Sequence, residues 1–412
     1  MDLLASATRR TQNRLKTKSL RPNQADLHKD SPLMSTIAAS ADSPKPAGEI
    51  QRVKFARADG FMNALRERVD GYFEEQNLSK RDHPRMYLKT AVILAWTVIS
   101  YLSLVLWSDS ILQTLASAAS LGLAMAAVGF NIQHDGGHGA YSKYPFVNGL
   151  MAFTLDILGG SSFIWKRTHN IVHHSYTNVT GVDGDIDLGF MGRLSPHQKR
   201  FWFHRLQHIY LWFLYGFITF KWQFHDDVRS LVLGRVGQTK VPRPKFGELI
   251  LLLTGKVLFL TLAFGLPLYL HAWYHVALWF FVASFVQGVM LSIVFQLAHV
   301  VEEADFPMPD GDSQRIENEW AVHQVETTVD FAQGSWLARW YTGGLNFQIE
   351  HHLFPQICHI HYPAISKIVR ETSEEFGVRY IAHETIWLAI GSHYRWLREL
   401  GRSNSTPVAS PA

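Results

Sequence analysis

Four long stretches almost free of charged side chains constrain the fold of this chain most. The first two, 91–107 and 111–133, are separated only by Ser-Asp-Ser, and the later pair, 249–270 and 276–297, only by His-Ala-Trp-Tyr-His. The one charge is Lys256, near the start of the third stretch. Each stretch approaches the roughly 20 residues that an α-helix needs to cross a bilayer. We therefore predict an all-α integral membrane protein with four transmembrane helices in two hairpins.

The distribution of lysine and arginine predicts the orientation of these hairpins. Both short connections lack basic residues, whereas the N-terminal region, the stretch 131–248 and the C-terminal region contain them. Because basic segments stay on the cytosolic side of a membrane, these regions and both termini are predicted to be cytosolic. There they would form a helical cap. The apolar segment 146–164, interrupted by Asp156 and by Gly159–Gly160, is predicted to be an interfacial helix.

The remaining sequence suggests one domain between two tails. Residues 1–50 are rich in Ser, Thr, Pro and charges without apolar periodicity, which predicts disorder. Residues 51–400 form the predicted membrane domain, and 401–412 a second disordered tail. Within 53–77, apolar residues recur at helical spacing, so a basic amphipathic helix is expected to dock on the membrane or on the protein itself. The single cysteine, Cys358, excludes an intrachain disulfide and an iron–sulfur cluster.

Some of the 21 histidines gather in three clusters that have the spacing of metal ligands on a helix. The clusters are His134 with His138, His169 with His173 and His174, and Gln348 with His351 and His352. Residues at i and i+3 or i+4 share one helix face, so each cluster can present side chains to one ion. His174 projects about 100° away from His173 around the axis and would reach a second ion. The clusters therefore predict two metal ions rather than one.

The surroundings of the clusters predict how such a centre is built. Imidazole without thiolate suits iron, copper, nickel or zinc. Gly136 and Gly137 would weaken a helix, so the first cluster is predicted to lie at a frayed helix end. A site outside the predicted spans, at the membrane surface, implies a lipid-soluble substrate. The carboxylates predicted to hydrogen-bond ligand imidazoles are Asp135, Asp183, Asp185, Asp187 and Glu350.

Other histidines are interpreted one by one. His299 emerges from the fourth stretch on the predicted cytosolic side, and we predict that it is a further ligand. His204 and His208 have ligand spacing but lie in an aromatic-rich segment, where histidines commonly pack with a solvated polar tip. His271 and His275 lie in a loop on the opposite side and cannot join the centre. Ordinary surface or core positions are predicted for His197, His225, His323, His383 and His393.

Two other classes of membrane protein conflict with this pattern. A bis-histidine cytochrome needs histidines inside the spans, and a proton-coupled transporter usually has ionisable groups near the midplane. The cores of the four stretches contain no His, Asp, Glu or Arg. A histidine-rich metal transporter is kept as the alternative from another class, and it would hold exchangeable zinc or nickel.

The clusters, read as HxxxH, HxxxHH and QxxHH in this order, resemble those of the membrane fatty acid desaturases over about residues 55–400. The glutamine of the third box resembles the front-end subgroup, which desaturates between an existing double bond and the carboxyl end. The strings SSFIWKRTHNIVHHSYTN and GGLNFQIEHHLFPQICHIHYP are similar to those of cyanobacterial-type acyl-lipid Δ6 desaturases without a cytochrome b5 domain.

This resemblance implies a cofactor, a reaction and a ligand set. The expected centre is di-iron, with O₂ as co-substrate, and it introduces a cis double bond at Δ6 into an unsaturated acyl-lipid or acyl-CoA. A hydroxylase, or a carotenoid or sphingolipid oxidase, on the same scaffold is the alternative. Gln348 would take the position left by the histidine ligands. Those ligands would be His134, His138, His169, His173, His174, His299, His351 and His352.

The resemblance also implies partners and a location. The chain has no HPGG haem motif, so electrons are expected from an external donor, ferredoxin or cytochrome b5. Lys166, Arg167 and Arg193 would contribute to a basic surface that attracts an acidic donor. No nucleic-acid partner is expected, and membrane lipid surrounds the spans. The expected location is the bacterial inner membrane.

Overall fold

A computed structural model describes residues 53–236, 239–311 and 313–403 of this chain. The predicted tail 1–50 and residues 404–412 lie outside the described residues, while the last helix continues two residues past the predicted domain end, to Arg402. In the described part, helical segments long and apolar enough to cross a membrane are Pro84–Leu106, Ile111–His138, Phe246–Leu270 and Trp273–His299. The predicted all-α membrane fold with two hairpins is confirmed.

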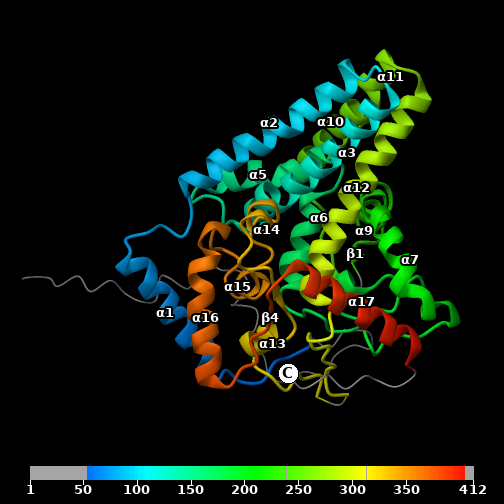
Figure 1. Cartoon of the computed structure of the whole chain (residues 1–412). Helices are drawn as coiled ribbons and strands as arrows, with labels where there is room; N and C mark the ends of the chain where they lie inside the picture. Colours follow the sequence, from blue (N-terminus) through cyan, green and yellow to red (C-terminus); the bar gives the residue numbers. More distant parts are fainter. Residues whose placement is uncertain (1–52, 237–238, 312, 404–412) are drawn as a thin grey trace, which may run out of the picture. The chain divides into compact units, whose positions relative to one another are not determined.

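The two hairpins lie side by side with their short loops at the same end (Figure 1). The first is built from α2 (Pro84–Leu106), α3 (Ile111–Val128), the π-helical turn η1 (Gly129–Gln133) and α4 (His134–His138). The second is built from α10 (Phe246–Leu260), η7 (Thr261–Gly265), α11 (Leu266–Leu270) and α12 (Trp273–His299). Both α4 and the end of α12 therefore carry histidines at the end opposite to the loops.

Small residues allow these helices to approach closely. A Cβ atom on Gly122 of α3 would lie only 2.4 Å from the carbonyl oxygen of Ala283 in α12, so no side chain fits there. Between α2 and α3, the hydroxyls of Ser103 and Ser117 are hydrogen-bonded at 2.9 Å. In a membrane, where lipid competes for apolar contacts, close packing and polar contacts of this kind hold helices together.

Lys256 occupies a different depth from the one predicted. It lies near the middle of the span Phe246–Leu270 rather than near its end. Its ammonium group donates hydrogen bonds to the carbonyl oxygens of Gly159 and Gln223. Because these carbonyls replace water as acceptors, the charge is tolerated in an apolar span. An ionisable side chain is therefore present inside a span, contrary to the prediction.

A bent pair of helices follows the first hairpin. It consists of α5 (Pro145–Ile157) and, after a turn, α6 (Ser162–Arg167) with the π-helical turn η2 (Thr168–His173). The bend is 119°, and it falls at the Gly159–Gly160 interruption that the sequence shows. A Cβ on Gly159 would lie 2.8 Å from the Phe259 ring, so the turn also needs glycine for space. The bend directs η2 and its histidines back toward α4.

A helical cap covers the histidine-bearing end of the hairpins (Figure 1). Its main helices are α1 (Phe61–Glu75), α13 (Trp320–Glu326), α15 (Gln348–Leu353), α16 (Tyr362–Phe376) and α17 (Ile386–Arg402). The amphipathic helix predicted over 53–77 begins at Phe61. Its apolar face is fully buried against α13, α15 and α16, with Phe61, Leu65 and Val69 at 0% exposure. Of the two predicted docking partners, the structure therefore selects the protein itself.

Short elements complete the cap and the connections. Strands β1 (Arg235–Val236) and β2 (Thr239–Lys240) pair antiparallel, whereas β3 (Asp330–Phe331) and β4 (Ala382–His383) pair in parallel. The other short elements are η3 (Gly184–Ile186), η4 (Trp202–Leu206), α7 (Gln207–Leu214), η5 (Tyr215–Phe217), α8 (Ile218–Lys221), η6 (Trp222–Asp226), α9 (Asp227–Leu233), α14 (Trp336–Tyr341) and η8 (His359–His361).

Candidate metal centre

The first histidine group joins three segments that are far apart in the sequence, where the cap meets the ends of the hairpins. Nitrogen atoms of its members lie within 4.8 Å of one another, and every member is buried. The members, from α4, η2 and α15, are His134, His138, His169 and His351. No two of these elements are consecutive in the sequence, so the group exists only because the cap folds onto the hairpins. Four nitrogen donors around one point suit a single metal ion.

A second group lies beside the first. It consists of His173 from η2, His299 at the end of α12 and His352 from α15, again within 4.8 Å and buried. The side-chain amide nitrogen of Gln348 lies 2.9 Å from His299 Nε2, so the glutamine faces this group. His174 forms an overlapping group with His351 and His352. The neighbours His173 and His174 thus serve different groups, whereas His351 belongs to the first group, His352 to the second, and both to the overlapping one.

The hydrogen bonds of the imidazoles fit metal binding. Nδ1 of His173 lies 3.0 Å from the Asp183 carboxylate, which can only accept, so Nδ1 carries the proton. Nδ1 of His352 lies 2.8 Å from Gln324 Oε1 in the same way. The opposite nitrogens, Nε2 of both rings, are buried and have no hydrogen-bond partner within the described residues. A lone pair left bare in a buried site is what a bound metal ion would satisfy.

Electrostatics keep His174, His351 and His352 neutral, whereas at His173 the effect of burial is outweighed by the Asp183 carboxylate, which raises the pKa. Burial lowers the pKa of His174, His351 and His352 well below the usual value, and neighbouring imidazoles lower it further. A second proton on these rings would be both desolvated and repelled. The rings therefore stay in the neutral form that binds metals. His351 Nε2 and His174 Nε2 lie only 3.0 Å apart, which suits two nitrogens aimed at a shared centre.

The outer contacts of the ligands agree only in part with the prediction. Asp183 contacts His173, and the Asp185 carboxylate lies 3.7 Å from the same Nδ1 and 3.9 Å from that of His169. Sequence patterns missed Gln324 and also Tyr362, whose hydroxyl lies 3.2 Å from His351 Nδ1. Gln324 lies far from any histidine box in the sequence, and Tyr362 follows the third box by ten residues, so cap packing and not helical spacing brings them to the ligands.

Three predicted carboxylate partners contact other groups instead. The Asp135 carboxylate lies 2.9 Å from Nδ1 of His359, a histidine outside the boxes. The Asp187 carboxylate accepts a hydrogen bond from the Gly189 backbone, because it caps a turn. Glu350 lies about 100° around α15 from His351, and its side chain contacts Tyr380 rather than a ligand imidazole. Its Oε1 lies 3.0 Å from the Tyr380 hydroxyl, which also contacts Asp330 at 2.8 Å.

The glycines of the first box serve packing rather than fraying. A Cβ on Gly136 would lie 2.6 Å from Met151 Cβ, and one on Gly137 would lie 2.2 Å from the Trp165 ring. The predicted frayed end is therefore wrong, because α4 is pressed between α5 and α6. Trp165 in turn stacks on His169 at 4.5 Å between ring centroids. π-helical turns of the kind that precede His134 and contain His169 are frequent at functional sites.

Other histidines predicted as non-ligands lie outside the groups found in the described residues. His204 nevertheless differs from the prediction, because it is fully buried and its Nε2 lies 2.8 Å from the Phe190 carbonyl oxygen. The expected solvated tip is therefore wrong. His208 is buried as well, with 5% exposure. His271 lies in the loop of the second hairpin, at the end of the spans opposite to the histidine groups (Figure 1).

Long apolar helices that carry buried multi-histidine groups at one end define a membrane protein with a metal site. The family model described as fatty acid desaturase matches residues 109–384. Because this match covers more than half of the chain, the chain belongs to the fatty acid desaturase family, and it is an oxidoreductase that acts on lipid acyl chains.

Curated relatives agree with this assignment. The chain is 41% identical to an sn-1 linoleoyl-lipid 6-desaturase of Arthrospira platensis, over 86% of this chain and 96% of that protein. It is also 41% identical to the protein of the same name from Synechocystis, over 86% and 99% of the two chains. An acyl-lipid (8-3)-desaturase of Physcomitrium patens is 39% identical over 84% of this chain and 72% of that protein.

Proposed function

We propose that this chain is a front-end acyl-lipid desaturase, which inserts a cis double bond at Δ6 into an acyl chain that is already unsaturated. The observation that carries this is the placement of Gln348, the residue typical of the front-end box, against His299 of the second group. The names of the cyanobacterial relatives, linoleoyl-lipid 6-desaturases, support the substrate class. We expect an acyl-lipid rather than an acyl-CoA.

We propose two iron ions as the cofactor. The first would be held by His134, His138, His169 and His351, with His174 beside them, and the second by His173, His299, His352 and Gln348. When bound, an iron pair supplies the redox chemistry by which O₂ is reduced to two waters with two hydrogens of the acyl chain, two external electrons and two protons. Donor sets that consist mainly of imidazole nitrogens, with no thiolate, support this choice.

The chain's own residues would prepare this site in two ways. Asp183 and Gln324 hold the Nδ1 protons of His173 and His352, which turns each Nε2 lone pair toward the centre. The Thr177 hydroxyl, 2.9 Å from Gln324 Oε1, fixes the orientation of that amide. Burial of every ligand side chain keeps bulk water away, and in a water-poor site these contacts are stronger than at a surface.

We propose that the histidine-bearing end and both termini are cytosolic, in a bacterial inner membrane, and that residues 51–400 form the desaturase domain. Loops without Lys or Arg near Ser108 and Trp273 support this orientation. Cysteines placed at these positions should react with an impermeant reagent added from the periplasmic side. Labelling of Lys166→Cys from that side would instead reverse the orientation.

We propose an external acidic electron donor, ferredoxin or cytochrome b5. The surface differs from the one expected, because Arg193 is buried and donates to the carbonyl oxygens of Leu400 and Ser403. Exposed arginines instead lie on α17, where Arg398 and Arg402 line a hollow of about 570 Å³. The hollow is also lined by Glu399 and by the ion pair of Arg395 with Glu302, so it has a small excess of positive charge. On the inner face of the same helix, His393 Nδ1 lies 2.6 Å from the carbonyl oxygen of Val300, which follows His299.

Expression in a host fed linoleate tests the proposed function. γ-Linolenate in the lipids, identified by mass spectrometry of the double-bond position, is the expected product. A double bond on the methyl side of the existing ones would reject the front-end assignment. A hydroxylated product would favour the hydroxylase alternative, and exchangeable zinc or nickel in place of iron would favour a metal transporter.

A further inference from the structure

One buried cation near the histidine groups has no role in the site described above. Lys89 of α2 is 7% exposed, whereas its neighbour Leu88 is 68% exposed and faces outward. A buried ammonium group is unfavourable unless other groups compensate for the lost water. Within the residues that the structure describes, no carboxylate forms an ion pair with Lys89, and its hydrogen-bond partner is His359. The position therefore holds an amine whose positive charge, when it is protonated, is only partly compensated.

A short polar chain fixes the direction of this charge. The Asp135 carboxylate lies 2.9 Å from His359 Nδ1, so that nitrogen carries the imidazole proton. His359 Nε2 is then an acceptor, and Lys89 Nζ donates to it over 3.0 Å. An ammonium group has three donors, and this bond uses one of them. The Trp340 ring, 5.8 Å from Nζ, faces the cation but accepts no conventional hydrogen bond. Two donors therefore remain for a further acceptor.

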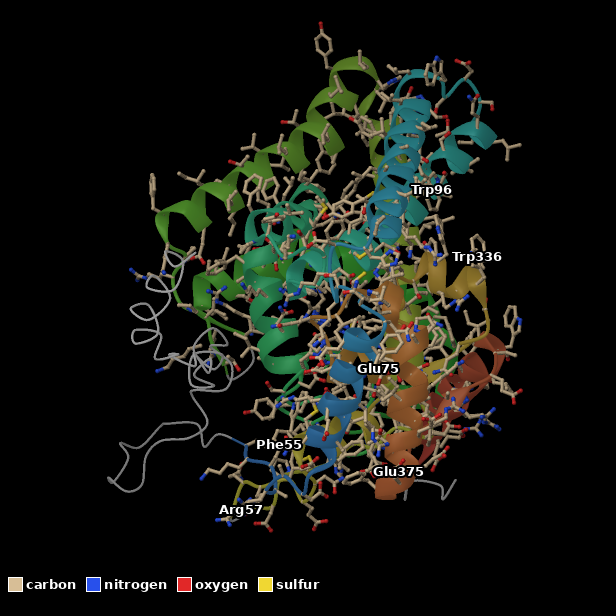
Figure 2. The ribbon with its side chains drawn as sticks, turned by 90° about the vertical axis from the view of Figure 1, so that its left-hand side faces the viewer. Phe55, Arg57, Glu75, Trp96, Trp336 and Glu375 are labelled. Atoms are coloured by element: carbon tan, nitrogen blue, oxygen red, sulfur yellow. The ribbon has the colours of Figure 1, made fainter. Side chains whose placement is uncertain are left out.

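Lys89 lies in the second turn of the membrane helix α2, near the end where the ester groups of a lipid are expected. α2 begins at Pro84, so at a rise of about 1.5 Å per residue Lys89 lies roughly 7 Å along the helix. The polar region on each side of a bilayer is about 5–8 Å thick. The neighbouring helix α14 exposes Trp336 and Leu337 at 67% and 64%, as expected for an interfacial helix. Figure 2 shows Trp96 of α2 and Trp336 of α14 on the same side of the molecule.

The polar chain also connects Lys89 to the first histidine box. Asp135, at its other end, directly follows His134 in α4. His359 lies in η8, shortly after the third box, and its backbone nitrogen also donates to Asp135 over 3.3 Å. A ligand held by Lys89 would thus have a fixed distance from the metal centre, because one rigid network positions both. A front-end enzyme needs such a fixed point, because the position of its new double bond is set by the distance from the carboxyl end of the acyl chain.

We propose that Lys89 binds the carbonyl oxygen at the carboxyl end of the acyl substrate, and that His359 and Asp135 are positioning residues for its ammonium group. The ligand class is an ester or carboxylate oxygen, which accepts the two remaining N–H donors. This inference rests on the proposed front-end function. It adds the residue from which the position of the new double bond is measured.

Three variants expressed in a host fed linoleate test this role. Lys89→Met removes the charge while keeping about the same side-chain length. Lys89→Arg keeps the charge but places it farther from the backbone of α2. Lys80→Met is the matched control. Lys80 is an exposed lysine just before α2 whose ammonium contacts Asp70 at 2.6 Å. The readouts are the amount of each variant in the membrane, the conversion per enzyme and the position of the new double bond.

The control should match the wild type in conversion and position. Lys89→Met should convert at least tenfold less substrate per enzyme, and its product should be spread over neighbouring positions. Lys89→Arg should recover conversion but with a shifted position. A purely structural lysine would lower the amount of enzyme without moving the double bond.

Unchanged position and conversion in Lys89→Met would overturn the inference, and so would a loss explained wholly by a smaller amount of enzyme. Should Lys89→Met fail to accumulate, Lys89→Arg decides, because wild-type positional purity in that variant rejects the anchor. Failure of the proposed function gives a different result, since the wild type itself would then make no γ-linolenate. If the wild type desaturates elsewhere, a shift caused by Lys89→Met still supports the anchor.

Discussion

Replacing Asp183 by asparagine should remove metal from the second histidine group while leaving the fold intact. Asp183 and His173 are both fully buried at the side chain, and their contact is 3.0 Å. The carboxylate also accepts from the backbone nitrogens of Asn178 and Asp185, at 2.9 and 3.0 Å. One carboxylate oxygen accepts from His173 and Asn178 and the other from Asp185. An amide has one oxygen, so its NH₂ group must face one of these donors, and its neutral oxygen accepts more weakly than a charged carboxylate. His173 Nδ1–H is therefore held less firmly in its tautomer.

The size of the effect follows from this contact. Loss of an outer partner of a metal-bound histidine typically lowers metal affinity about 10–100-fold, which corresponds to roughly 1.4–2.7 kcal/mol. We therefore expect the purified wild type to hold two irons per chain after dialysis against a mild chelator, and Asp183→Asn to hold about one. Elemental analysis, with protein measured by amino-acid analysis, gives both values.

Asp187→Asn is the matched control for this experiment. Asp187 lies in the same segment and also looked like a ligand partner in the sequence, but its carboxylate caps the Gly189 turn. Its iron content should equal that of the wild type. Equal losses in both variants would show that the whole segment loosened, and full iron retention in Asp183→Asn would refute the assigned role of the contact.

Three further predictions follow from other contacts. Gln348→His should change activity or product position although it adds a stronger ligand, because it replaces the amide 2.9 Å from His299; unaltered product and rate would contradict this. The double variant Arg398→Glu with Arg402→Glu should lower the rate of donor-driven turnover and make that rate less sensitive to salt. The control is Arg66→Glu, at an exposed arginine of α1 on the other side of the cap (Figure 1), and it should change neither quantity. Burial and then Asp330 raise the pKa of Glu350 well above its usual value, so the folded state keeps a proton that the unfolded state loses above about pH 4.3. The contribution of Glu350 to the free energy of unfolding should therefore fall as pH rises from 5 to 8, opposite in sign to that of the histidines whose pKa is lowered. Glu350→Gln removes this contribution, so the difference between its thermal-unfolding curve and that of the wild type should change with pH; parallel curves would exclude a protonated Glu350.

Local patterns were sufficient for the parts of the fold that depend on short stretches of chain. An uncharged run of about 20 residues has few alternatives to a membrane helix, because its backbone polar groups must pair within the run. The two hairpins were predictable for this reason, although the depth of Lys256 was not. Its charge is accepted only because carbonyls of Gly159 and Gln223, from two other segments, reach it.

For the histidine boxes too, local spacing predicted one part of the site and the tertiary structure decided the rest. Spacing along a helix made it predictable that His351 and His352 could serve a metal site and that adjacent histidines diverge. It could not decide that His351 joins His134 whereas His352 joins His299, since those partners come from the two separate hairpins.

The amino-acid sequence by itself determined the membrane helices, the histidine boxes and, through resemblance, the desaturase family. The boxes depend on residues within about one or two helical turns, the membrane helices on continuous runs of about 20 residues, and the family on the order of motifs along the chain. The tertiary structure decided the partners: Asp183 rather than Asp187 for His173, Gln324 for His352, and His359 rather than a box histidine for Asp135. A hydrogen bond requires atoms about 3 Å apart, and residues far apart in the chain meet at that distance only when the cap packs onto the hairpins.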